Sequence, residues 1–387
     1  MKNLLCAALF CSAVLITGQG KKFYEKGEVD FKQRVERINM RFENNLPFVK
    51  VTIRNKTYTF LFDSGAPTVI SQAIFRELNL KKKYRRSVGD SNKNTQEQIF
   101  TELPEMKIDQ VTFRNTGAVV LDLNADELRC LHVDGIIGAN QMAGLVWRLN
   151  YAENQLEVAK DISGFDLRGF DLVIPFGTSI QKTPLITIRM FDKDLPFTFD
   201  TGFSGRLELT EAEFNPGKVQ RSVRTSGTHS TGAFGTAKPS EGYIFRAQAI
   251  GIGNSVFKEE IVSTGSMNLI GNEFFRDFTC IMDWKSRRIY MKRIRTVPAV
   301  LESFGFSYRF LESKPVVAYV IGEDESLIRN GDIILAINGI SLEHLDQDQV
   351  CHYFLHRIES NQRVINIKID RGGKVFDYQI ERKAYLN

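Results

Sequence analysis

Short runs of hydrophobic and β-favouring residues, separated by polar turns, recur along most of the chain. Residues 48–54, "FVKVTIR", and residues 58–63, "YTFLFD", form one such pair of runs. A second pair, "PLITIR" at 184–189 and "LPFTFD" at 195–200, has nearly the same order of residue types. Runs of this length and composition, bounded by turn residues, are typical of β-strands. The pattern therefore predicts a mainly β protein.

Both pairs belong to a longer pattern that occurs twice, at 38–65 and at 172–202. In each copy the third predicted strand ends in an aspartate, and a hydroxyl residue and a glycine follow it. The two triplets are Asp63, Ser64, Gly65 and Asp200, Thr201, Gly202. One such triplet alone would indicate a turn, since all three residue types favour turns. Two copies that each close a hydrophobic strand indicate a duplicated unit.

A second motif follows each triplet at a similar distance. Two hydrophobic residues and a glycine end at Gly138, 75 residues after Asp63, and again at Gly271, 71 residues after Asp200. After each glycine a charged, β-like segment closes the copy, "NQLEVAK" in the first and "RRIYMKR" in the second. Neither short motif is specific alone, but the matched spacing indicates two units of about 120 residues with one plan.

The two aspartates, Asp63 and Asp200, are candidates for a pair of carboxylates in one pocket. Two carboxylates that share a pocket cannot both ionise easily, so one of them keeps its proton. The ionised member can take a proton from a water molecule, and the protonated member can hydrogen-bond a substrate carbonyl. The glycine of each triplet lets the backbone turn tightly, and the hydroxyls of Ser64 and Thr201 suit hydrogen bonds to the opposite loop. This chemistry is hydrolysis without a covalent intermediate.

These residues resemble the motifs of the aspartic peptidases. "FDSGA" is similar to the retroviral-type motif, "FDTGFSG" to a bacterial variant, and "IIGAN" and "LIGNE" to the glycine motif of that superfamily. The resemblance covers residues 35–295 and implies two duplicated retropepsin-like β-barrel lobes with the active site between them. It implies catalytic roles for Asp63 and Asp200. It also implies supporting roles for Ser64, Gly65, Thr201 and Gly202, and glycine-motif positions for Gly138 and Gly271.

Access to such a site would depend on a bulky residue and on two hairpins. Phe203 departs from the family pattern, because the retroviral enzymes have alanine there and the pepsins a hydroxyl residue. The phenylalanine would narrow the site or shift its specificity. The flap of that family would fall in residues 87–100 or 226–245, and either segment is equally consistent with an ordinary exposed hairpin.

The pattern changes after residue 295. "SFGF" at 303–306 and "GDIILAING" at 331–339 resemble the carboxylate-binding loop and a later strand of PDZ domains. The resemblance implies that Phe304, Gly305 and Phe306 bind the C-terminal carboxylate of a peptide while the peptide adds a strand to a sheet edge. The alternative is a docked domain that has no ligand of its own.

The N-terminus has the three-part layout of a secretory signal peptide. A lysine precedes an apolar run from Leu4 to Ile16, and small or polar residues extend to Gly20. The run is short for a membrane span, and Leu5 and Phe10 are not the small residues that should precede a lipidated cysteine. We therefore expect cleavage near Gly18 to Gly20, no lipid anchor, and no transmembrane span in the mature chain.

The cysteines beyond this segment do not form a recognisable framework. Cys130, Cys280 and Cys351 are odd in number and widely scattered. Export would permit disulfides, but this spacing favours buried free thiols.

Other signals exclude several classes of function. A net charge of +5 is small for 387 residues and gives no case for nucleic acid. His352 and His356 are four residues apart, but "HYFLH" lacks the glutamate of the zinc-protease motif and no third ligand is evident. We expect neither a metal nor a cofactor.

The sequence thus predicts an exported aspartic endopeptidase with a PDZ-like β/α domain. The expected division is 1–20 signal peptide, 21–36 extension, 37–160 first lobe, 161–295 second lobe and 296–387 PDZ-like domain. The expected partners are a peptide or protein substrate and a C-terminal peptide ligand, with a monomer located in the periplasm, the cell envelope or the exterior. The alternative is a catalytically silent peptide- or protein-binding protein on the same scaffold, although carboxylates in both triplets favour the enzyme.

Overall fold

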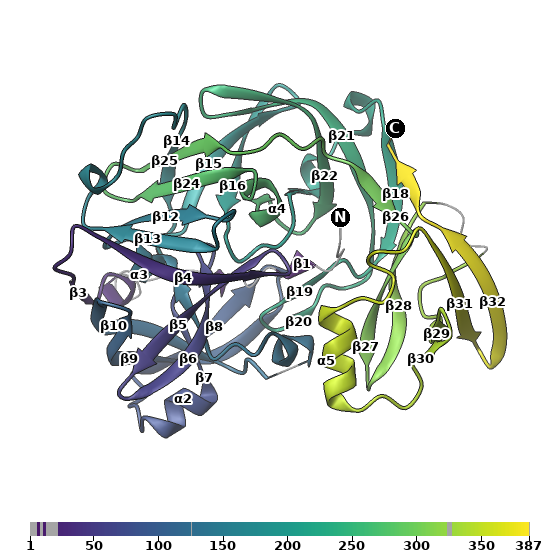
Figure 1. Cartoon of the computed structure of the whole chain (residues 1–387), viewed down its shortest axis with the longest axis horizontal. Coiled ribbons are helices and arrows are strands. Elements are labelled where there is room, and N and C mark those ends of the chain that lie inside the picture. Colours follow the sequence, from purple (N-terminus) through teal and green to yellow (C-terminus); the bar gives the residue numbers. More distant parts are fainter. Residues whose placement is uncertain (1–5, 8–10, 13–21, 125, 323–326, 387) are drawn as a thin grey trace.

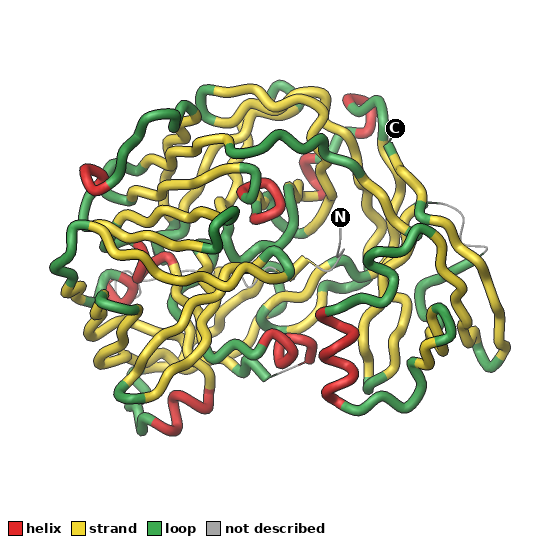
Figure 2. Tube along the Cα trace, viewed as in Figure 1, coloured by secondary structure: helices red, strands yellow, loops and turns green. Residues whose placement is uncertain are grey.

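The computed structural model describes residues 6–7, 11–12, 22–124, 126–322 and 327–386. The protein is mainly β, as predicted, and helices are few and short (Figure 2). Most of the predicted signal segment, residues 1–20, lies outside the described residues. Two short pieces of it, β1 (Cys6–Ala7) and β2 (Cys11–Ser12), pair with residues 230–231 and 89–90. None of the described helices is long and apolar enough to cross a membrane.

The first strand group, residues 28–159, includes the strand that ends at Asp63. Most of its strands are labelled in Figure 1. Its strands are β3 (Glu28–Asp30), β4 (Val35–Glu43), β5 (Leu46–Ile53), β6 (Lys56–Asp63), β7 (Val69–Ser71), β8 (Tyr84–Asp90), β9 (Thr95–Ile108), β10 (Val111–Leu121), β11 (Gly135–Gly138), β12 (Val146–Asn150) and β13 (Gln155–Ala159). Its helices are α2 (Gln72–Glu77), α3 (Ala139–Met142) and the 3-10 helix η1 (Asp126–Leu131). Strand β6 lies between antiparallel β5 and parallel β11, β11 is antiparallel to β7, and β7 is parallel to β10.

The second strand group surrounds Asp200 with the same pattern of neighbours. Its strands are β14 (Leu172–Thr178), β15 (Pro184–Met190), β16 (Lys193–Phe199), β17 (Leu207–Thr210), β18 (Ser222–Gly227), β19 (Ser230–Gly232), β20 (Gly235–Thr236), β21 (Ser240–Ile252), β22 (Ser255–Gly265), β23 (Leu269–Ile270), β24 (Phe278–Asp283) and β25 (Arg288–Arg293), with α4 at Asn272–Phe275. Strand β16 lies between antiparallel β15 and parallel β23, β23 is antiparallel to β17, and β17 is parallel to β22.

Tight turns set the register of the hairpins that lead to each aspartate. The β4–β5 turn, Asn44 and Asn45, has φ of 51° and 59°, a left-handed pair that asparagine tolerates well. The β15–β16 turn has the same geometry at Phe191 and Asp192, with φ of 52° and 63°. Phenylalanine is unfavourable there, but its ring stacks on Phe245 with a centroid distance of 5.8 Å. Packing therefore overrides the local preference.

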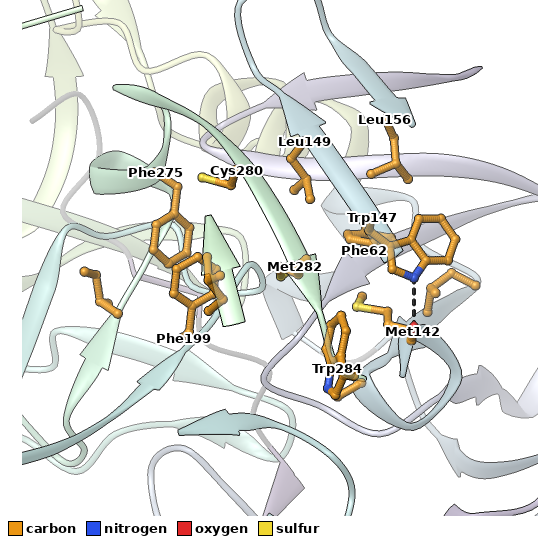
Figure 3. Packing of buried hydrophobic residues seen from close by; sticks show 14 of the residues in the cluster. Phe62, Met142, Trp147, Leu149, Leu156, Phe199, Phe275, Cys280, Met282 and Trp284 are labelled. Carbon is orange, nitrogen blue, oxygen red and sulfur yellow. Dashed lines mark hydrogen bonds between the residues drawn. The ribbon is translucent and has the colours of Figure 1, made fainter. Parts of the chain in front are cut away.

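A sheet shared by the two groups carries the main core. Strands β4, β13, β12, β24, β25 and β14 pair in that order, all antiparallel, so that β12 and β24 join the groups. The residues just before the two aspartates are anchored in this core (Figure 3). Phe62 meets Trp147 edge to face with centroids 5.1 Å apart, and Phe199 stacks on Phe275 at 3.9 Å. This packing fixes the strand ends that bear the carboxylates.

The C-terminal strand group has its own hydrophobic cluster but is tied to both other groups. Its elements are β26 (Leu301–Ser303), β27 (Phe306–Leu311), β28 (Lys314–Ile321), β29 (Ile333–Ile337), β30 (Ile340–Ser341), α5 (Gln347–Leu355), β31 (Val364–Arg371), β32 (Lys374–Glu381) and β33 (Lys383–Tyr385). Strand β28 pairs with β18, so one sheet continues from the second group into this one (Figure 1).

The expectation of free thiols is wrong for two of the three cysteines. Cys130 on η1 and Cys351 on α5 form a disulfide across 221 residues of sequence. The bond is possible because α5 packs against η1 and brings the two Cα atoms to 4.9 Å. Cys280 is a buried free thiol, as expected.

Candidate active site

The structure brings Asp63 and Asp200 together at the ends of β6 and β16. Both side chains are fully buried. Each triplet glycine lies against the opposite carboxylate: a Cβ added at Gly65 would be 2.5 Å from Cγ of Asp200, and one at Gly202 would be 2.3 Å from Cγ of Asp63. No side chain larger than hydrogen fits at either position. The two carboxylates therefore share one pocket.

The two hydroxyl residues cross-link the loops as expected. The backbone N–H of Ser64 donates to Oγ1 of Thr201 at 2.9 Å, and the N–H of Thr201 donates to Oγ of Ser64 at 3.0 Å. Each hydroxyl then donates to a carbonyl of the other group, Ser64 to Phe199 at 2.7 Å and Thr201 to Phe62 at 2.8 Å. All four bonds are buried, so they fix the two aspartates relative to each other.

Backbone amides hold one oxygen of each carboxylate. Oδ1 of Asp63 accepts from the N–H groups of Gly65 at 2.7 Å and Ala66 at 3.0 Å, and Oδ1 of Asp200 accepts from Gly202 at 2.7 Å. Oδ2 of each aspartate is buried and has no hydrogen-bond partner among the described residues. These two oxygens are the ones left for a water molecule or a substrate.

Burial and proximity keep a proton on the pair. Burial, and next the Asp200 carboxylate, raise the pKa of Asp63 well above its usual value. Burial also raises the pKa of Asp200, and the N–H of Gly202 and other donors partly offset this rise. The two carboxylates therefore hold one proton between them.

The predicted motif glycines, Gly138 and Gly271, lie directly behind the two loops. Gly138 is the register partner of Asp63 on β11, and a Cβ there would be 2.0 Å from the backbone of Pro67. A Cβ at Gly271 would be 2.4 Å from the carbonyl oxygen of Phe203. Both positions need glycine because the backbones pass so closely.

Several supporting residues were missed by sequence reasoning. The amide of Asn272 donates to the carbonyl of Thr201 at 2.7 Å, and Oδ1 of Asn140 accepts from the N–H of Thr68 at 2.7 Å. Both asparagines stand one or two places after a motif glycine, which was the available signal. Gln181 and Thr183 donate from the second group to the carbonyl of Gly65, each at 3.1 Å, and no motif marked them.

Phe203 does not point into open solvent. Its ring is buried and packs with Leu269 and Met267 beside the second triplet. The backbone N–H of Phe203 donates to the backbone carbonyl of Asp200 at 3.2 Å. It therefore forms an apolar wall close to Asp200.

The two segments considered as flaps meet each other. Oδ2 of Asp90, at the end of β8, accepts from the N–H of Phe234 at 2.9 Å. The amides of Asn92 and Asn94 donate to the carbonyls of Gly235 and Thr236, each at 3.2 Å. The turn at 90–94 is thus hydrogen-bonded to the loop at 230–236. Neither hairpin stands free in this structure.

The segment predicted to bind a peptide carboxylate is packed. Phe304 and Phe306 are buried in the C-terminal cluster, and the carbonyl of Gly305 accepts from the N–H of Ile321 at 2.7 Å. Helix η1 contacts both α5 and the later part of β27. Oε1 of Glu127, on η1, accepts from the backbone N–H of Phe310 on β27 at 3.3 Å.

The same glutamate forms a buried ion pair. Oε2 of Glu127 accepts from Nη2 of Arg309 at 2.5 Å, and both side chains are only 4% exposed. Arg309 also donates to Oγ1 of Thr231 on β19 at 3.0 Å. One arginine of the C-terminal group therefore touches both other groups.

The histidines give no metal site. His352 and His356 are adjacent, with ring centroids 5.2 Å apart. Within the described residues, no group of three or more His, Cys, Asp or Glu side chains could hold a metal ion.

Comparison with known proteins adds one match. A family model described as aspartyl protease matches residues 49–140, the segment that contains the first triplet and Gly138. A search of curated proteins finds no match to the chain. The mainly β structure is consistent with the β-rich fold of aspartic proteases. The family match points to peptidase activity. The chain therefore contains an aspartic-protease-like domain.

Proposed function

We propose that the protein is an exported aspartic endopeptidase that hydrolyses peptide bonds with a water molecule activated between Asp63 and Asp200. One observation carries the proposal: each triplet glycine lies within about 2.5 Å, measured from its added Cβ, of the opposite carboxylate. Two buried carboxylates this close share a proton. The aspartyl protease match to residues 49–140 supports the same reaction.

The proposed mechanism assigns different roles to the two aspartates. Asp200 accepts a proton from the water molecule through its Oδ2, which has no hydrogen-bond partner among the described residues. Asp63 holds the shared proton and donates it to the oxygen of the scissile carbonyl. The water oxygen bonds to the carbonyl carbon and gives a tetrahedral diol. Asp200 then gives its proton to the peptide nitrogen while one diol hydroxyl gives its proton to Asp63. The C–N bond breaks, a carboxylic acid and an amine are released, and the pair returns to its starting state.

We propose that the two strand groups are duplicated retropepsin-like β-barrel lobes, at 37–160 and 161–295, with 21–36 as an extension. The identical order of neighbours around β6 and β16 supports this division. Since one chain supplies both carboxylates, a monomer would be sufficient for activity.

Residues 296–387 are proposed to be a PDZ-like domain that docks onto the protease. The order of β27, β28, β29 and α5 and the loop at Phe304–Phe306 support the PDZ-like assignment. The contact of Glu127 with the edge of β27, and the Cys130–Cys351 disulfide, favour docking over peptide recruitment. A free peptide would have to displace η1 from that edge.

Export is proposed on two grounds. Residues 1–20 have the layout of a signal peptide, and disulfides form and persist mainly in oxidising compartments. A periplasmic, envelope or extracellular location fits both.

The experiment that tests the proposed function is cleavage of a diverse peptide library. The purified mature chain is incubated with the library at several pH values between about 4 and 8, and the cuts are mapped by mass spectrometry. Cuts that disappear in the Asp63→Asn variant are expected. An absence of cuts at every pH would leave the binding-protein alternative.

A further inference from the structure

A buried glutamate in the second strand group occupies the position of a buried valine in the first. Leu269 on β23 has Glu208 on β17 as its register partner, and Ile136 on β11 has Val69 on β7. Leu269 and Ile136 stand at the same place in the two glycine motifs, so Glu208 corresponds to Val69. Glu208 is only 4% exposed.

A second difference makes room for the carboxylate. Gly265 on β22 pairs with Thr210, two residues beyond Glu208, as Leu121 on β10 pairs with Ser71, two residues beyond Val69. A Cβ at Gly265 would lie 2.2 Å from Cδ of Glu208. The exchange of leucine for glycine thus accompanies the exchange of valine for glutamate, and it creates space for a longer, polar side chain.

The corresponding site in the first group is apolar and adjoins its carboxylate. Val69 and Leu121 belong to a buried cluster with Ala66, Leu61 and Val88. Ala66 directly follows the first triplet and donates its N–H to Asp63. Leu269, the register partner of Glu208, packs with Phe203 and Met267, the apolar wall beside Asp200. Glu208 therefore stands one strand away from that wall, and the N–H of Met267 in the wall donates to it.

The groups around Glu208 leave its charge without a cation. Oε1 accepts from the N–H of Met267 at 3.3 Å, and Oε2 lies 3.9 Å from Nε2 of His229. Among the described residues, His229 is the only basic side chain recorded within 4 Å of this carboxylate. Its Nε2 is buried without a hydrogen-bond partner in the part of the chain that the structure describes. Burial lowers the pKa of His229 and raises that of Glu208 to about 7.

From this geometry we propose that Glu208 and His229 form a specificity pocket for a cationic substrate side chain, an ammonium or a guanidinium, on one side of the scissile bond. The proposal rests on the proposed function and names its substrate class. A cation would pair with Oε2 of Glu208, and the neutral imidazole offers an acceptor nitrogen. The apolar cluster around Val69 in the first group would accept an apolar substrate side chain on the other side of the scissile bond. A buried carboxylate without a counter-charge destabilises the protein. A cationic substrate side chain that pairs with Glu208 should therefore bind better than a neutral one.

The test compares lysine with norleucine, which has the same apolar stem without the ammonium group. Two peptide series, built around a cut found with the library, place either residue just before or just after the scissile bond. On one side only, in an assay near pH 7 where Glu208 is partly ionised, kcat/KM for lysine should exceed that for norleucine by at least about tenfold, equivalent to about 1.4 kcal/mol. The variant Glu208→Gln should lose this preference, since its amide keeps an acceptor for Met267 but has no charge.

Glu211→Gln is the matched control, because Glu211 is an exposed carboxylate three residues along the chain. It should leave the lysine preference unchanged. Norleucine peptides cut by both the wild-type chain and Glu208→Gln would show that each is folded and active. Equal rates for lysine and norleucine on both sides in the wild-type chain, or a preference that survives in Glu208→Gln, would overturn the pocket while leaving the peptidase proposal intact. A wild-type chain that cuts no peptide would overturn both.

Discussion

Replacing Thr201 with valine removes one hydroxyl from the cross-link between the two aspartate loops. Valine has nearly the same shape, so the change leaves little cavity. It leaves the buried N–H of Ser64 and the buried carbonyl of Phe62 without the partner that each has now. An unsatisfied buried backbone group costs about 1–3 kcal/mol. The two groups together predict a loss of about 2–6 kcal/mol in the free energy of unfolding.

This loss would be large beside the typical total stability of about 5–15 kcal/mol. It is measured by urea unfolding as a lower midpoint with an unchanged slope. Thr201→Ser is the control, because it keeps the hydroxyl and removes only a methyl group. A loss of less than about 1 kcal/mol for Thr201→Val, or an equal loss for both variants, would refute the view that these bonds hold the loops together.

The remaining predictions concern packing, the disulfide and pH. Gly65→Ala should reduce kcat/KM by roughly 100-fold, because its Cβ would displace Asp200; Gly177→Ala, with no other heavy atom nearer than 4.0 Å, should not change the rate. Cys351→Ser should lower the free energy of unfolding by about 2–5 kcal/mol, and reductant should destabilise the wild-type chain but not this variant. The rate should be greatest between about pH 4 and 6.5 and fall as the pH rises through the raised pKa of Asp63; undiminished activity above about pH 8 would contradict the shared proton.

Much of the candidate site could be predicted because its information is local. Each triplet closes a hydrophobic strand, and the motif glycines recur at matched distances, so Asp63, Asp200, Gly138 and Gly271 could be picked out from the sequence alone. The loops do come together as expected.

What could not be predicted depends on contacts between distant segments. Cys130 and Cys351 are 221 residues apart, and their spacing carries no sign that η1 packs against α5. Likewise, nothing local to Glu127 marks it as the partner of Arg309. The position of Glu208 opposite Leu269 also required the observed register, because the loop after the second triplet is two residues longer.

The direction of the stability change expected for Asp63→Asn provides a control for the activity measurements. Burial raises the pKa of Asp63 above its ordinary value of 3.8, so the folded state binds more protons than the unfolded state between that value and the raised one. The contribution of this group to stability is therefore greatest at low pH and is lost as the pH rises. Asp63→Asn removes the penalty, and we expect it to be at least as stable as the wild-type chain at pH 7.

The most direct measurement is kcat/KM for Asp63→Asn and Asp200→Asn on one well-cut peptide, with urea unfolding of each variant alongside. The account predicts that both variants stay folded and that each loses at least about 100-fold in kcat/KM, since neither carboxylate can replace the other. A folded variant of either kind that retains more than about a tenth of the wild-type value, a loss of less than about 1.4 kcal/mol, would contradict the shared-dyad mechanism.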